Sequence, residues 1–154
     1  MASMKTKNVP NIPSDLIAPC GINCGLCYAH LREKDKCVCC NIDQPRKPKH
    51  CLTCKIKFCD QKPGASSFCF DCRKYPCTRL RQLDKRYVTR YGVSVIDNLD
   101  KINKLGIKQF MAIENTRWVC QECGGPICIH NKKCYSCGKQ YPSHNSVTSI
   151  IHSN

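Results

Sequence analysis

Apolar residues recur at helical spacing mainly between residues 78 and 116 of this 154-residue chain. The first stripe consists of Leu80, Leu83, Tyr87 and Tyr91. Pro76 comes before this stripe and Gly92 follows it directly, so Gly92 is placed to end the helix. The spacing therefore predicts an amphipathic helix that begins near residue 78 and ends at Gly92.

Two further helices are predicted in the same way. Ser94 is a suitable N-cap for a second helix, and Gly106 is its expected stop. The apolar positions of this helix are Ile96, Leu99, Ile102 and Leu105. A short third helix carries Phe110 and Ile113 and leads towards Trp118. We interpret the three stripes as helix faces that pack on the rest of the chain.

The rest of the chain is dominated by cysteine rather than by large apolar residues. The chain has 17 cysteines, and 12 of them lie between Cys20 and Cys77. The first eighteen residues lack the apolar run of a secretory signal, and no stretch is long enough to span a membrane. We therefore expect a cytoplasmic protein with reduced thiols, and disulfides are the less favoured alternative. Metal binding would then replace the missing hydrophobic core.

The spacing is most specific near the C-terminus. Two Cys-x2-Cys pairs, each followed by glycine, are formed by Cys120, Cys123, Cys134 and Cys137. Two intervening residues let both thiolates of a pair face one ion, and the glycine allows a tight turn with its amide facing a sulfur. The ten residues between the pairs suffice for a hairpin with Asn131 and Lys132 near its tip. Four soft thiolates favour structural zinc, with rubredoxin-like iron as the competitor.

Two more residues between these pairs carry metal-binding groups. His130 could replace a thiolate, but the set of four is already complete, so we expect a structural role for it at the surface. Cys128 is expected to be a small buried residue, with a reactive thiol as the minor alternative.

Eleven upstream cysteines are further candidate metal ligands. They are Cys20, Cys24, Cys27, Cys37, Cys40, Cys51, Cys54, Cys59, Cys69, Cys72 and Cys77. The unit CLTCKIKFC returns as CFDCRKYPC eighteen residues later, which suggests two similar loops that share metal. The first two cysteines of each unit could make one zinc site, and Cys59 and Cys77 could complete neighbouring sites. The sequence leaves the pairing open.

The spacing of Cys20, Cys24 and Cys27 is also that of a 4Fe-4S cluster, which Cys37 or Cys40 could complete. Radical chemistry at such a cluster is disfavoured because the chain is too short to build the barrel that those enzymes need.

The formal charge of +14 counts every thiol as neutral. A zinc ion with four thiolates carries −2, so four such sites would leave about +6. On an ideal helix Arg79, Arg86 and Arg90 fall within about 40° of one another. This row could contact the phosphates of RNA or DNA, or it could be a solvated flank that balances the thiolates.

The cysteine motifs also resemble a known family. The segments APCGINCGLCYAH, CKIKFC and CFDCRKYPC, the pair Cys37-x2-Cys40 and the helical continuation are similar to the domain-of-unknown-function family 3795, a cysteine-rich family of bacteria and archaea. The resemblance covers residues 18–140 and implies a metal-binding domain without implying an activity. The chain departs from the family at Cys39, where glycine is expected, and Cys51 has no confirmed place in the family pattern.

These observations predict a small metal-stabilised α+β protein with an irregular cysteine-rich multi-metal module, a three-helix segment and a C-terminal zinc ribbon. The predicted division is a flexible tail at 1–18, the cysteine-rich module at 19–116 with its helical continuation at 78–116, the zinc ribbon at 117–142 and a flexible tail at 143–154.

The predicted function is a zinc-stabilised binding or accessory module with a protein or nucleic-acid partner and no membrane association. An iron–sulfur electron carrier is the first alternative, and an RNA- or DNA-binding zinc protein is the second. Enzyme activity is less favoured, because the chain has 11 acidic residues and no phosphate-binding or hydrolase motif. His30 and His50 lie near Cys27 and Cys51 in sequence and could form cysteine–histidine pairs, but thiolates that bind metal are poor nucleophiles.

Overall fold

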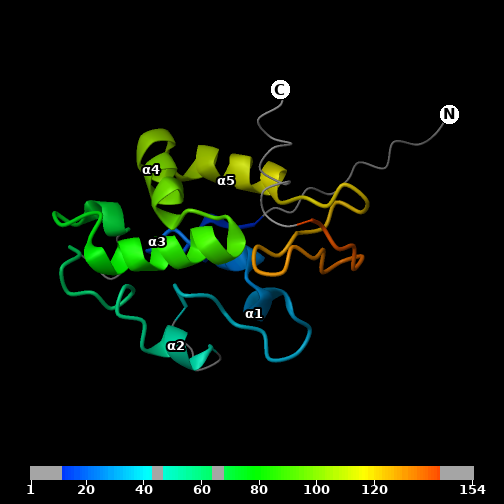
Figure 1. The fold of residues 1–154 in the computed structure, drawn as a ribbon, viewed down its shortest axis with the longest axis horizontal. Helices are drawn as coiled ribbons and strands as arrows, with labels where there is room; N and C mark the ends of the chain where they lie inside the picture. The colour runs from blue at the N-terminus through cyan, green and yellow to red at the C-terminus, as the bar shows by residue number, and fades with distance from the viewer. Residues whose placement is uncertain (1–11, 43–46, 64–67, 143–154) are drawn as a thin grey trace.

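The computed structural model describes residues 12–42, 47–63 and 68–142. Its first half contains short helical turns and its second half contains the longer helices (Figure 1). The elements are η1 (Ser14–Leu16), η2 (Cys24–Leu26), α1 (Tyr28–Leu31), α2 (Lys49–Leu52), η3 (Cys69–Asp71), α3 (Thr78–Tyr91), α4 (Val95–Leu105) and α5 (Ile107–Arg117). The three predicted helices are therefore confirmed.

The predicted ends of the helices are confirmed in detail. Gly92 adopts the left-handed conformation with φ of 67°, and its amide donates to the carbonyl oxygen of Val88. A residue with a Cβ would be strained in this conformation, which is why glycine ends α3. The Ser94 hydroxyl accepts a hydrogen bond of 3.0 Å from the amide of Asp97 and so caps α4. Sequence alone thus determines where α3 ends and α4 begins.

The predicted apolar stripes are only partly correct. Leu99, Ile102 and Phe110 are buried as expected, but Leu105 and Ile113 are each 39% exposed. The buried face of α5 includes Glu114, which is 3% exposed. The α5 helix packs against α4 and η1, and these neighbours, rather than the apolar pattern alone, decide which of its faces is covered.

Helix packing against the cysteine-rich segment is confirmed. One cluster of buried residues joins Cys20, Cys24, Cys39 and Cys69 to Leu80 of α3 and to Val95 and Leu99 of α4. The α4 helix also contacts α3, α5 and η3. In Figure 1 the helix α3 crosses the centre of the molecule, with α4 and α5 on one side and α1 and α2 on the other.

A second core cluster brings the two ends of the described chain together. It contains Ile17 and Leu26 from the N-terminal part, Phe110 from α5, and Ile127 and Ile129 from the C-terminal ribbon. Within the part of the predicted tail that is described, Ile12, Ile17 and Ala18 are buried, with Ile17 and Ala18 each 1% exposed, whereas residues 13–15 are exposed. The remainder of that tail and the tail predicted at 143–154 lie outside the described residues.

The predicted β component is small. Antiparallel pairing in the described residues consists of isolated bridges, such as Val119 with Pro126 and Ile127 with Cys134, rather than of extended strands. The fold is thus a small cysteine-rich helical structure with little strand. The described segments contain no helix with the length and apolar character needed to cross a lipid bilayer.

Candidate metal centre

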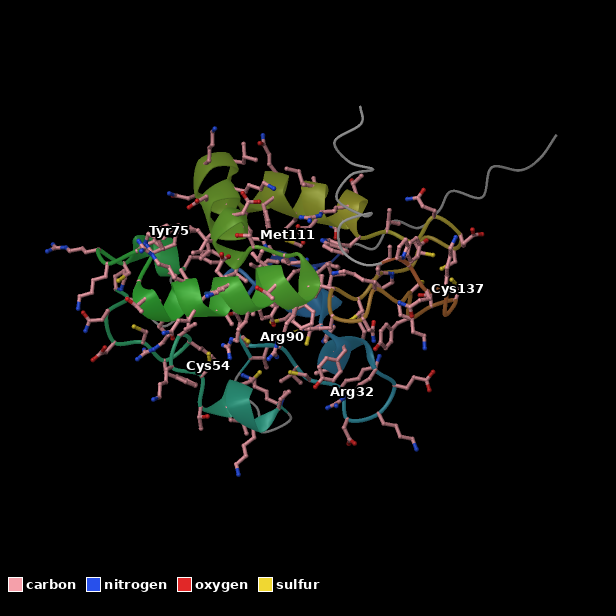
Figure 2. The ribbon with its side chains drawn as sticks, in the orientation of Figure 1. Arg32, Cys54, Tyr75, Arg90, Met111 and Cys137 are labelled. Carbon is pink, nitrogen blue, oxygen red and sulfur yellow. The ribbon has the colours of Figure 1, made fainter. Side chains whose placement is uncertain are left out.

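The C-terminal ribbon is built on a short hairpin, as the sequence predicts. The amide of Cys128 donates to the carbonyl oxygen of Lys133, and Ile127 bridges to Cys134. Lys132 closes the turn with a φ of 56°, in the left-handed region. The hairpin places the two cysteine pairs side by side, and Cys137 marks this end of the molecule in Figure 2.

The four predicted ribbon ligands are brought together. The sulfur atoms of Cys120, Cys123, Cys134 and Cys137 all lie within 4.8 Å of one another. The Cys120 and Cys137 sulfurs are 3.7 Å apart, and those of Cys123 and Cys134 are 3.5 Å apart. Four thiolates at the usual Zn–S distance of about 2.3 Å would be about 3.8 Å apart, so the arrangement fits one tetrahedral ion. No other group of three or more histidine, cysteine or carboxylate ligands in the described segments is this compact.

The glycines of the ribbon have one of their two predicted roles. Gly124 and Gly138 have φ of 79° and 81°, so both provide the expected tight turn. Their amides, however, donate to the carbonyl oxygens of Cys120 and Cys134 and not to sulfur. The sulfur of Cys123 instead receives a bond of 3.3 Å from the amide of Gly125, one residue later.

Sequence reasoning missed Tyr141 as part of this site. Its hydroxyl donates to the Cys120 sulfur at 3.1 Å and accepts from the amide of Gln121 at 2.8 Å. Desolvation raises the pKa of the Cys120 thiol, but the Tyr141 hydroxyl and nearby backbone amides outweigh it and lower the pKa to about 6. A thiolate is the form that binds metal, so these donors favour metal binding. No spacing rule identifies Tyr141, because it follows the last cysteine pair.

The two other ribbon residues lie outside the set of four. Cys128 is fully buried, as predicted. His130 is half-buried rather than at the surface, and the rings of Tyr28, Tyr87 and Tyr91 surround it edge-on at centroid distances of 5.4, 5.9 and 4.8 Å. Burial, with a smaller effect of the nearby Lys132 charge, lowers the pKa of His130 to about 4. His130 is therefore a neutral packing residue.

The ribbon is attached to the rest of the chain by specific hydrogen bonds. The amide of Ile129 donates to the carbonyl oxygen of Leu26 at 3.1 Å. The Lys132 ammonium, which is 5% exposed, donates to the carbonyl oxygen of Tyr91 at 2.7 Å and to that of Ile129 at 2.6 Å. Tyr91 is the last residue of α3, where carbonyl groups carry the negative end of the helix dipole.

Upstream thiols gather in the first core cluster, and His30 is not paired with Cys27 as predicted; the His50 side chain, predicted to lie near Cys51, is outside the described part of the chain. The sulfurs of Cys24 and Cys40 are 3.6 Å apart. The His30 Nδ1 atom lies 3.3 Å from the sulfur of Cys39 and 2.8 Å from the carbonyl oxygen of Cys37. The histidine that was expected near Cys27 is thus paired with Cys39, which is 1% exposed and closed to a substrate.

Cys39 also has an unusual backbone. Its φ is 75°, in the left-handed region that glycine adopts without strain. Glycine is the residue that the family resemblance leads us to expect at this position. The positive φ gives a physical reason for that expectation, because the backbone of Cys39 is strained in a conformation that glycine adopts without strain.

The remaining predicted ligands differ in their surroundings. Cys59 and the three cysteines of the second repeat unit, Cys69, Cys72 and Cys77, line one cavity. Cys20 and Cys37 are buried, and Cys27, Cys51 and Cys54 are half-buried. All 17 cysteines lie within the described residues, and none of them is in a disulfide.

The chain matches no protein-family model, no curated protein and no solved structure. The resemblance to family 3795 thus stays a prediction based on the cysteine motifs. The four ribbon thiols define a cysteine-rich protein with a candidate metal centre.

Proposed function

We propose that this chain is a zinc-stabilised binding or accessory module. The observation that carries the proposal is the compact set of four ribbon thiols, whose separations suit a single tetrahedral ion. Two of these thiols, those of Cys120 and Cys134, are fully buried, while Cys123 and Cys137 are exposed. A closed set of four protein ligands leaves no position for a substrate, so the zinc has a structural role.

A basic helix face is the contact surface in this proposal. The exposed residues of α3 include Arg79, Arg86 and Arg90 on one side of the helix, whereas Arg81 and Lys85 are exposed on another side. The acidic residue of the helix, Asp84, turns instead towards α4, where it accepts from the Ser94 hydroxyl at 2.7 Å. The face that remains is positive over the length of the helix. Such a face suits a protein or nucleic-acid partner with negative charge.

The zinc assignment is tested by metal analysis of the full chain and two matched variants. We expect Cys123→Ser to lose one zinc per chain relative to the wild type. Cys128→Ala alters a thiol of the same ribbon that is outside the set of four, and it should retain that zinc. Equal zinc content in Cys123→Ser and the wild type would contradict the proposal.

A further inference from the structure

A cavity lies between the N-terminal end of α3 and the segment around residues 55–62, and Tyr75, which is labelled in Figure 2, is one of its lining residues. The space open to the centre of a water-sized sphere is about 30 Å³, and the cavity is partly open to solvent. Four thiols line it, those of Cys59, Cys69, Cys72 and Cys77. Four is the number of thiolates that hold a tetrahedral zinc ion or an iron–sulfur cluster.

The spacing of these thiols differs from that in the ribbon. In the part of the chain that the structure describes, no three of the cavity thiols lie within 4.8 Å of one another, whereas all four ribbon thiols do. A single zinc ion needs thiolates about 3.8 Å apart. The corners of a 4Fe-4S cluster hold them roughly 6 Å apart. A cavity lined by four cysteines that are not gathered around one point therefore suits a polynuclear centre better than a single ion.

The thiols of Cys69, Cys72 and Cys77 lie in the η3 turn, at its end and at the start of α3, and burial raises the pKa of the Cys69 thiol to about 11. Cys69 is the first residue of η3 and Cys72 is its C-cap, and the Cys72 sulfur accepts a bond of 3.4 Å from the amide of Lys74. This bond has the same two-residue offset as the one from Gly125 to the ribbon ligand Cys123. Cys77 occupies the N-cap position of the 14-residue helix α3 without forming a capping hydrogen bond. The positive end of the helix dipole lies at this position, where an anionic centre is favoured.

Cations complete the lining of the cavity. Lys55, Lys62 and Arg79 all contribute to its wall. Lys62 is 8% exposed, and its ammonium group donates to the carbonyl oxygen of Lys57 at 3.0 Å. A buried ammonium group is costly unless negative charge lies close by. An oxidised 4Fe-4S cluster with four thiolates carries −2 and would provide that charge.

We propose that Cys59, Cys69, Cys72 and Cys77 bind an iron–sulfur cluster of the 4Fe-4S class. The site differs from the one that spacing favoured at Cys20, Cys24 and Cys27. Its Cys-x2-Cys pair and Cys77 come from one repeat unit, and Cys59 is the last cysteine of the other. The proposal goes beyond the zinc-stabilised role of the ribbon, because the two sets of ligands share no residue.

The test is anaerobic reconstitution of the full chain with ferrous iron and sulfide. We expect about four iron ions and four sulfide ions per chain, and an absorbance band at about 400 nm. Cys77→Ser and Cys72→Ser should lose most of the band and of the iron while they retain the ribbon zinc. Cys123→Ser should give the opposite result, with the band kept and one zinc lost. The retained zinc and the helical circular dichroism show that the variants are folded.

A second measurement needs no variant. Alkylation of the loaded wild-type chain followed by peptide mass analysis should show Cys59, Cys69, Cys72 and Cys77 protected, and all four modified after the cluster is destroyed by oxidation. The proposal is overturned if the chain takes up zinc but no iron at these thiols. It is also overturned if a cluster forms that Cys24→Ser abolishes and Cys77→Ser leaves intact. Either result would leave the zinc assignment of the ribbon unaffected.

Discussion

Gly21 is the position at which a single methyl group should separate α4 from the cysteine-rich segment. It follows Cys20 directly and has a φ of 92°. A Cβ at this residue would lie 2.6 Å from the carbonyl oxygen of Val95 and 2.9 Å from Cγ of Leu99, so the start of α4 would have to move. The carbonyl oxygen of Gly21 also accepts a buried hydrogen bond of 3.0 Å from the Asn98 side chain. Gly21→Ala therefore disturbs a packed junction.

The magnitude follows from comparison with Gly106→Ala. Gly106 has a similar φ of 86°, but a Cβ there has no neighbour within 4 Å. Both substitutions incur backbone strain of about 1–3 kcal/mol, and both change the unfolded chain equally. Overpacking adds about 1–3 kcal/mol for Gly21 alone. We expect Gly21→Ala to lower the free energy of unfolding by about 2–6 kcal/mol and Gly106→Ala by about 1–3 kcal/mol.

The assay is urea unfolding followed by helical circular dichroism at a fixed free zinc concentration, because metal binding shifts the apparent stability. The informative quantity is the difference between the two variants, about 1–3 kcal/mol, which is the overpacking that only the Cβ at Gly21 causes. Equal destabilisation by Gly21→Ala and Gly106→Ala would refute the close approach of α4 to Gly21. The m-value should be unchanged in both, which shows that the native and unfolded states keep their compactness.

Three further outcomes are expected. Tyr141→Phe removes the donor to the Cys120 sulfur and should weaken zinc binding by about 10–100-fold in a chelator competition. Unchanged zinc affinity would show that the Tyr141 hydroxyl does not contribute to metal binding. The pKa of His130 is about 4 in the folded chain and about 6.5 in the unfolded chain, so unfolding takes up a proton between these two pH values. The free energy of unfolding therefore decreases as the pH is lowered from 6.5 to 4. Relative to His130→Gln, the wild type should lose about 3 kcal/mol between pH 7 and pH 4, and parallel pH profiles would contradict the burial of a neutral imidazole. If α3 contacts nucleic acid, Arg86→Gln with Arg90→Gln should reduce the slope of log affinity against log salt by about 2 in fluorescence anisotropy, and an unchanged slope would place the contact elsewhere.

The helices are predictable from sequence because their boundaries depend on local chemistry. Gly92 and Gly106 supply positive φ and Ser94 supplies a cap, and none of these roles depends on distant residues. The buried face of α5 is less predictable. Glu114 is 3% exposed and accepts a 3.3 Å bond from the Asn23 side chain, 91 residues away. An apolar pattern cannot indicate a carboxyl group that a distant amide has paired.

The same distinction explains the metal sites. The ribbon ligands are two local pairs, and the hairpin between them is short enough to be built from spacing alone. The upstream pairing depends on the path of the chain. Spacing favoured Cys51 and Cys54 as partners of the second repeat unit, and this pairing stays a prediction, while Cys59 lines one cavity with the three cysteines of that unit. Cysteines from distant segments share one core cluster with residues of α3 and α4, and one of them, Cys39, has a left-handed backbone conformation. Neither feature can be read from the cysteine spacing.

The ribbon also influences the basic helix, although the two lie apart in sequence. A metal ion bound by the four ribbon thiols would hold the cysteine pairs together and so fix the hairpin that carries Lys132. The Lys132 ammonium donates to the carbonyl oxygen of Tyr91 and lies 4.8 Å from the centre of the Trp118 ring. Because Tyr91 ends α3, the hairpin contacts the C-terminal end of the helix that carries Arg86 and Arg90, and these contacts stabilise that end. Under the proposed function, the ribbon metal would therefore support a contact surface that it does not touch.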